Sequence, residues 1–274
     1  MPPSLMANKN ILLAIWILLF CSDLKAQFAF IPPSETYQSK RVNGIIIGES
    51  ILATATTLGL QFLWYKKFPK SRFHFFNDNA EWLNVDKVGH AVTAYNIGSI
   101  QHDLMRWGGV TEGTSILVGS LTSIGFMTAI EFMDGFSSKW GFSPGDMLAN
   151  ISGALVFAAQ QYGWHNQRIQ LRYSYHGTIF PTYNPGELGR NLPQRMLKDY
   201  NGQTYWLSIN LPSFLATNTD VPKWLNFSFG YGAEGMVGAR SNPTEVNGVT
   251  IPKFDRVRQF YFSAGPSLSN YPPT

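Results

Sequence analysis

The chain has 274 residues, of which 14% are charged and 15% are aromatic. Soluble domains carry about 25% charged residues, so this composition favours a protein that associates with a membrane, and the length allows one large or two small domains. The formal net charge of +4 is too small to indicate a nucleic-acid-binding protein.

Residues 1–26 are typical of a secretory signal peptide. Lys9 precedes the apolar run 11–20, which is about half the ~20 residues that cross a bilayer. Ala26 is a small residue at the expected cleavage position, so we expect the mature chain to begin at Gln27, in a bacterial cell envelope. An uncleaved membrane anchor is the alternative.

The only cysteine, Cys21, lies inside this leader. Its surroundings invite interpretation as a lipoprotein, but Phe20 is bulky where lipoprotein processing needs a small residue. Cleavage after Ala26 would remove the cysteine and leave the mature chain without disulfides, thiolate nucleophiles or cysteine metal sites.

Four apolar stretches follow, and each has the length of a helix that nearly spans a membrane. They cover residues 42–65, 86–107, 113–134 and 143–162. Small residues recur in them, which lets helices approach closely inside a membrane or in a packed bundle. The predicted fold is therefore mainly α, with a four-helix hydrophobic bundle forming a membrane-associated core over residues 27–165.

The pattern changes from Gln167 onward. Apolar or aromatic residues alternate with polar ones over residues 203–210, 224–232 and 258–263, which predicts β-strands. Frequent prolines exclude long helices there. We expect a strand-rich, Pro-rich region over residues 166–263, followed by a disordered or truncated tail at residues 264–274.

Three polar motifs interrupt the apolar helices. Asp86 and His90 are four residues apart and share a helical face, with Lys87 beside them. A second pair of carboxylates, Glu131 and Asp134, is three residues apart. Asp146 and Asn150 form a third stripe. Packing these stripes inward would bury one polar network. The candidate site consists of Asp86, Lys87, His90, Glu131, Asp134, Asp146 and Asn150.

Each motif also has a structural interpretation. Ser143, Pro144 and Asp146 together form the signature of a helix N-terminus. Asp86 falls in a first turn, where the helix dipole favours a carboxylate. His90 lies inside its helix, and ionisable residues on helices of membrane-spanning length are candidate functional residues by default.

The order and spacing of these motifs resemble a known pattern. Asp86-Lys87-x-x-His90, an acidic residue on the third helix, and Asp146-x-x-x-Asn150-x-x-Gly153 are similar to motifs of VanZ-like membrane proteins. The sequence resembles more closely the YfiM-type family of predicted periplasmic lipoproteins. The resemblance covers about Asp86 to Gly153 and implies an envelope location and a helical core. It implies no molecular activity.

Two functions remain open. The first is an envelope protein without catalytic activity, and the second is a hydrolase or transferase acting on a lipid-linked or cell-wall substrate. In the second, His90 would be a general base or a ligand of magnesium, manganese or zinc. His102, three turns further along, is a more distant candidate partner of His90. A two-histidine zinc motif, a Gly-x-Ser-x-Gly motif and a phosphate-binding glycine loop are absent from the sequence. Membrane lipid is the expected partner; the cofactor is unknown.

Overall fold

The computed structural model describes residues 31–63, 68–215, 220–222 and 224–266. The predicted signal peptide, its cleavage site at Gln27 and Cys21 lie outside the described residues. The described chain forms two compact units. The first contains Asn79–Val92 and the residues from Arg168 onward, and the second contains the residues up to Asp78 together with Thr93–Gln167.

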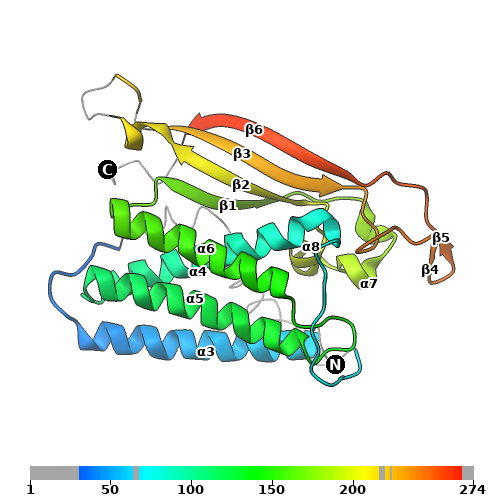
Figure 1. Cartoon of the computed structure of the whole chain (residues 1–274), viewed down its shortest axis with the longest axis horizontal. Coiled ribbons are helices and arrows are strands. Elements are labelled where there is room, and N and C mark those ends of the chain that lie inside the picture. Colours follow the sequence, from blue (N-terminus) through cyan, green and yellow to red (C-terminus); the bar gives the residue numbers. More distant parts are fainter. Residues whose placement is uncertain (1–30, 64–67, 216–219, 223, 267–274) are drawn as a thin grey trace, which may run out of the picture. The chain divides into compact units, whose positions relative to one another are not determined.

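Helices form over all four of the predicted stretches. Their bounds are α3 Ser39–Leu63, α4 Val85–Trp107, α5 Glu112–Asp134 and α6 Pro144–Trp164 (Figure 1). The boundary between the two units falls within α4, after Val92, but α4 is one uninterrupted helix. The first two turns of α4 therefore belong to the first unit, and the remainder of the helix belongs to the second.

Small residues let α4 and α5 approach each other closely in the second unit. A Cβ atom added at Gly119 of α5 would lie 2.5 Å from the carbonyl oxygen of Gly98 in α4. The Ser123 hydroxyl donates a hydrogen bond of 2.6 Å to the carbonyl oxygen of Ala94. The step from Gly119 to Ser123 along α5 is four residues forward, and the matching step from Gly98 to Ala94 along α4 is four residues backward. The two helices therefore run antiparallel.

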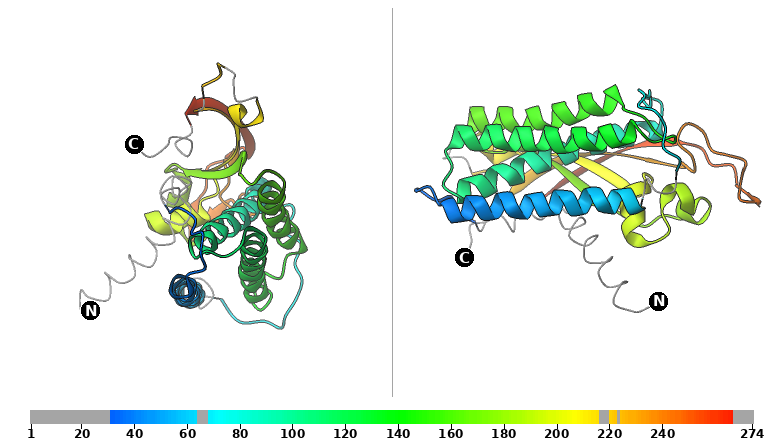
Figure 2. Two further views of the ribbon diagram at one scale, coloured as in Figure 1. Left: turned by 90° about the vertical axis from the view of Figure 1, so that its left-hand side faces the viewer. Right: turned by 90° about the horizontal axis from the view of Figure 1, so that it is seen from below.

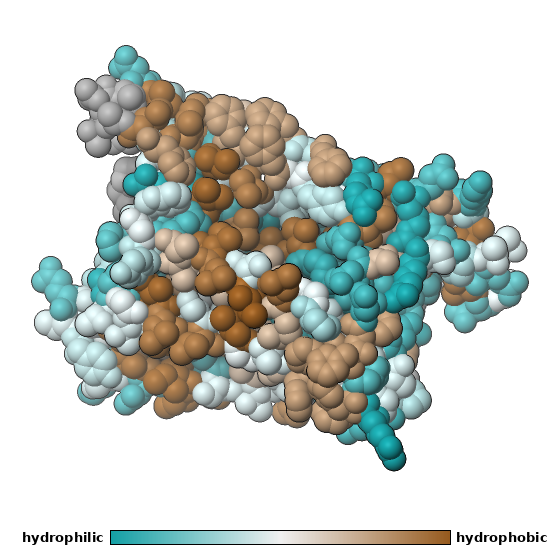
Figure 3. All heavy atoms as spheres, viewed as in Figure 1, coloured by the Kyte–Doolittle hydropathy of each residue, from teal (hydrophilic) through white to brown (hydrophobic). Residues whose placement is uncertain are grey.

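Large apolar side chains are exposed on the helices of the second unit. They include Ile47 on α3, Leu121 on α5 and Leu148 and Leu155 on α6, and Figure 3 shows apolar side chains gathered on the surface over α5 and α6. Among the described residues, Ser39–Gln61 and Glu112–Asp134 are long and apolar enough to cross a membrane. Length and composition alone do not separate a membrane span from a packed helix, so membrane crossing stays a prediction.

The first unit contains a four-stranded antiparallel sheet in the order β1-β2-β3-β6. The strands are β1 Ile169–Tyr175, β2 Gln203–Asn210, β3 Leu225–Glu234 and β6 Val257–Pro266. Figure 2 shows that the sheet is strongly curved. Strands β2, β3 and β6 match the three predicted stretches, and β6 continues three residues into the predicted tail.

Short elements fill the remainder of the first unit. The helices α7 Pro185–Leu188 and α8 Leu192–Lys198 have proline in their first turn, and β4 Glu245–Val246 pairs with β5 Val249–Thr250. Asn247 and Gly248 connect β4 and β5 with positive φ angles of 51° and 81°, as a two-residue hairpin turn requires. The expectation that long helices are excluded from this region agrees with these short helices.

The apolar core of the first unit holds the start of α4. Val85 and Val92 of α4 are buried together with Tyr173, Tyr205 and Met236 from the C-terminal region. Burying side chains of this size contributes roughly 1.5–3 kcal/mol each relative to leaving them in water. The position of the first two turns of α4 is therefore fixed by residues more than eighty positions later in the chain.

Candidate functional site

A turn of unusual backbone conformation precedes α4. Trp82, Leu83 and Asn84 have φ angles of 47°, 52° and 68°, values that cost about 1 kcal/mol or more for residues other than glycine. The Trp82 amide donates to the carbonyl oxygen of Ala239 over 2.8 Å, and the Tyr231 hydroxyl donates to that of Leu83. The C-terminal region thus stabilises a strained turn immediately before Asp86.

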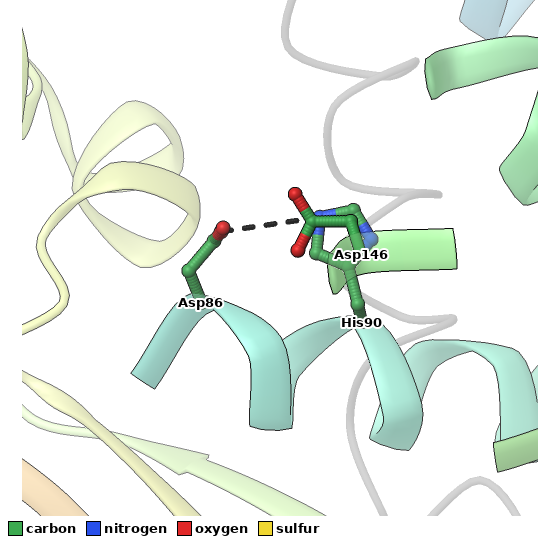
Figure 4. Close-up of side chains that lie close together, drawn as sticks. All are labelled: Asp86, His90 and Asp146. Atoms are coloured by element: carbon green, nitrogen blue, oxygen red, sulfur yellow. Dashed lines mark ion pairs between the residues drawn. The ribbon is translucent and has the colours of Figure 1, made fainter. Parts of the chain in front are cut away.

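Asp86 and His90 form a pair one turn apart on α4 (Figure 4). Oδ1 of Asp86 lies 3.9 Å from Nε2 of His90 and accepts a hydrogen bond of 2.6 Å from the Tyr200 hydroxyl. Nζ of Lys87 lies 3.5 Å from the other carboxylate oxygen. The three side chains on α4 are only 13–20% exposed, so their charges interact in surroundings that contain little water.

A second polar group surrounds the start of α6. The Ser143 hydroxyl accepts a hydrogen bond of 3.1 Å from the Asp146 amide and donates one of 2.6 Å to Asp78. The Ser143 amide donates over 3.2 Å to Oε2 of Glu131. Glu131, Asp146 and Asn150 are buried, with at most 4% of each residue exposed. The predicted helix cap at Ser143 is confirmed, and it lies among buried acidic residues.

His102 lies near the other end of α4, away from His90. Its ring nitrogens face Asp103 at 2.9 Å and Glu112 at 3.3 Å, and twelve residues of helix, about 18 Å, separate it from His90. Glu112 also accepts a hydrogen bond of 2.7 Å from Gln161 of α6. His102 is therefore not a partner of His90, but it lines a separate pocket of about 530 Å³.

The contacts of the second unit fix how α5 packs along the part of α4 that follows Val92. The Ala94–Ser123 contact lies eight residues from Glu131 on α5. Eight residues of helix rise about 12 Å.

The same reasoning applies to α6. A Cβ atom added at Gly98 would lie 2.9 Å from the ring of Phe157, and the Glu112 carboxylate joins the residues four positions later on each helix. Helices α4 and α6 are therefore parallel.

The first unit brings together Asp86 and His90, and Figure 4 shows both side chains on one face of α4. Carboxylate oxygens with one imidazole nitrogen suit hard or intermediate divalent cations. Asp134 is the last residue of α5 and is only half-buried. The geometry of the first unit therefore selects two of the seven predicted residues as possible cation ligands.

Some residues around these groups carry no local sequence signal. Tyr200 and Asp78 contact Asp86 and Ser143 across 114 and 65 residues of chain. Only a tertiary structure reveals such contacts, because no helical or strand periodicity connects positions so far apart. The role of Ser143 itself is predictable from the local sequence, because its spacing to Asp146 is that of a helix cap.

Residues 74–161 match the model of a family described as a predicted periplasmic lipoprotein (DUF2279). No curated protein and no solved structure matches the chain. The match contains all seven predicted site residues and excludes the sheet. It supports an exported protein that is periplasmic or associated with the membrane, in agreement with the location predicted from the sequence.

Proposed function

We propose that this envelope protein binds a divalent cation with Asp86 and His90 and uses it in a hydrolase or transferase reaction. The observation that carries the proposal is the approach of Oδ1 of Asp86 to within 3.9 Å of Nε2 of His90 on one face of α4. The substrate class that fits an exported protein with exposed apolar helices is a lipid-linked or cell-wall compound. We also propose that the chain is related to the YfiM-type family and to VanZ-like membrane proteins, because its motifs resemble theirs.

The donor spacing is close to that of a bound cation. Ligand atoms about 2.0–2.2 Å from a zinc ion are about 3.5 Å apart in a tetrahedral site. Asp86 and His90 are at 3.9 Å, so small side-chain rotations would complete the contact.

The number of protein ligands favours a reaction over a purely structural role. Structural zinc sites use four protein ligands, whereas Asp86 and His90 would leave coordination positions for water and substrate. Such a cation would lower the pKa of its bound water and supply a nucleophile at neutral pH. In this chain, Asp86 and His90 would hold the cation, and Lys87 would contribute positive charge toward an anionic substrate.

Calorimetric titration of the purified full chain with Zn²⁺, Mn²⁺ and Mg²⁺, after chelation and dialysis, tests the cation site. We expect one equivalent to bind the unaltered protein and binding to weaken at least tenfold in His90→Ala. His176→Ala is the matched control, because His176 is exposed and lies outside the site. Absence of binding, or equal affinity in the His90→Ala protein, would contradict the proposal.

A non-catalytic polar network is the second candidate, and the hydrogen bonds among Ser143, Glu131 and Asp146 favour it. Removing one partner of a buried charged pair typically costs ~3–5 kcal/mol. If His90→Ala lowers the free energy of unfolding by this amount and no cation binds, the network is structural. Cation binding together with loss of turnover of a lipid-linked or cell-wall substrate would support the enzyme.

A further inference from the structure

Tyr200 connects the C-terminal region to Asp86, one of the two proposed cation ligands. Its hydroxyl donates a hydrogen bond of 2.6 Å to Oδ1 of Asp86, the carboxylate oxygen that faces His90 at 3.9 Å. Tyr200 lies outside residues 74–161, which match the family model. The contact therefore gives the C-terminal region a role that the family motifs do not record.

We infer that Tyr200 is a positioning residue that orients the Asp86 carboxylate for cation binding, an inference that rests on the proposed cation site. A carboxylate has several acceptor positions on its two oxygens. When a tyrosine hydroxyl occupies one of them, the carboxylate can no longer rotate freely and its other lone pairs keep a fixed direction. Groups that orient metal ligands in this way typically change metal affinity by about 10–100-fold.

The segment around Tyr200 is built to hold that hydroxyl in place. The neighbouring residues Asp199 and Asn201 are at most 1% exposed. Nδ2 of Asn201 donates to Asp199 over 2.8 Å and to the carbonyl oxygen of Met236 over 2.9 Å, while its Oδ1 accepts from the Met236 amide over 2.7 Å. A buried carboxylate and amide are costly unless fully bonded, and here they fix the turn that presents Tyr200.

The ring of Tyr200 is fixed as well. Its centroid lies 5.0 Å from that of Trp82 at an interplanar angle of 39°, and Trp82 belongs to the strained turn that precedes Asp86. The C-terminal region thus sets both the backbone position of Asp86, through this turn, and its carboxylate orientation, through the hydroxyl. Two independent restraints on one ligand are the arrangement that a pre-organised site requires.

Tyr200→Phe tests the inference, because it deletes the hydroxyl and leaves the ring against Trp82. Tyr173→Phe is the matched control: it deletes a hydroxyl that also donates over 2.6 Å, to the carbonyl oxygen of Met196, in the same apolar core. Both variants of the full chain are titrated with Co²⁺ alone, and the visible absorption spectrum of the bound Co²⁺ and its affinity are measured. Thermal unfolding of the metal-free proteins shows whether both variants fold equally well.

We expect Tyr200→Phe to bind Co²⁺ about 10–100-fold more weakly with altered visible bands, and Tyr173→Phe to match the unaltered protein in both. If the Tyr200 hydroxyl had only a structural role, the two variants would show similar changes in unfolding temperature, and the visible absorption bands of bound Co²⁺ would not change. Normal Co²⁺ affinity and spectrum in a folded Tyr200→Phe protein would overturn the role of Tyr200 alone. Failure of the unaltered protein to bind Co²⁺ would overturn the cation site, and this inference with it.

Discussion

Gly89 in the Asp-Lys-x-Gly-His motif is expected to be required by packing rather than by chemistry. A Cβ atom added there would lie 2.6 Å from the hydroxyl oxygen of Tyr205 and 3.1 Å from Cζ. Tyr205 is buried and donates a hydrogen bond of 2.9 Å to Gln203. Tyr205 cannot move away without breaking this bond or displacing its neighbours.

The expected magnitude for Gly89→Ala follows from opposing effects. Overpacking a filled core costs ~1–3 kcal/mol, and weakening the Tyr205 hydrogen bond costs ~1 kcal/mol. Replacing glycine by alanine inside a helix gains up to ~1 kcal/mol. The packing cost exceeds the gain, so Gly89→Ala should lower the free energy of unfolding by about 1–3 kcal/mol.

Urea unfolding followed by circular dichroism measures this free energy. Tyr205→Phe removes the atom at 2.6 Å, so the double variant Gly89→Ala/Tyr205→Phe should be more stable than the sum of the single changes predicts, by ~1 kcal/mol or more. Gly163→Ala is the control, because no atom lies within 4 Å of its added Cβ. A Gly89→Ala protein as stable as the unaltered one, or strictly additive changes, would refute the reasoning.

Three further outcomes are expected. Ser143→Ala should destabilise the protein by ~1–2 kcal/mol in urea unfolding, because it removes the α6 cap, whereas Ser152→Ala on the exposed face of α6 should change stability by under ~0.5 kcal/mol. Burial raises the pKa of Asp199. Its contribution to stability should therefore be greatest below about pH 4 and be lost as the pH rises through the folded-state pKa. The free energy of unfolding of Asp199→Asn, measured against pH, should lack this dependence. Intact mass of the native protein should correspond to a chain that begins at Gln27; a lipid-modified Cys21 at the N-terminus would contradict this.

The helices were predictable because their signals are local. The starts of α4, α5 and α6 were expected within one residue of their positions, since Ser143 and Pro144 mark a helix start and the apolar stretches end in glycine turns. Strands β2, β3 and β6 were found from their alternation. Strand β1 has the same alternation, with Gln170, Arg172 and Ser174 between apolar or aromatic residues, but the prediction covered it only as part of the strand-rich region.

The candidate site was predictable only in part, for a physical reason. Helical spacing placed Asp86 with His90 and showed that Asp146 heads another polar stripe, but it carries no information on which elements meet. Within the second unit, the packing of α5 and α6 on α4 depends on the small residues Gly98, Gly119 and Ser123. Tyr200 depends on a turn fixed by Asn201, which no pattern in the sequence connects to α4.

The most direct test of the cation site is anomalous diffraction from crystals of the full chain grown with Mn²⁺. The account predicts one strong peak at roughly 2.0–2.4 Å from a carboxylate oxygen of Asp86 and from Nε2 of His90. The peak should be absent from crystals of His90→Ala grown under the same conditions. A map without a peak beside these two residues, at a Mn²⁺ concentration that saturates binding in solution, would contradict the account.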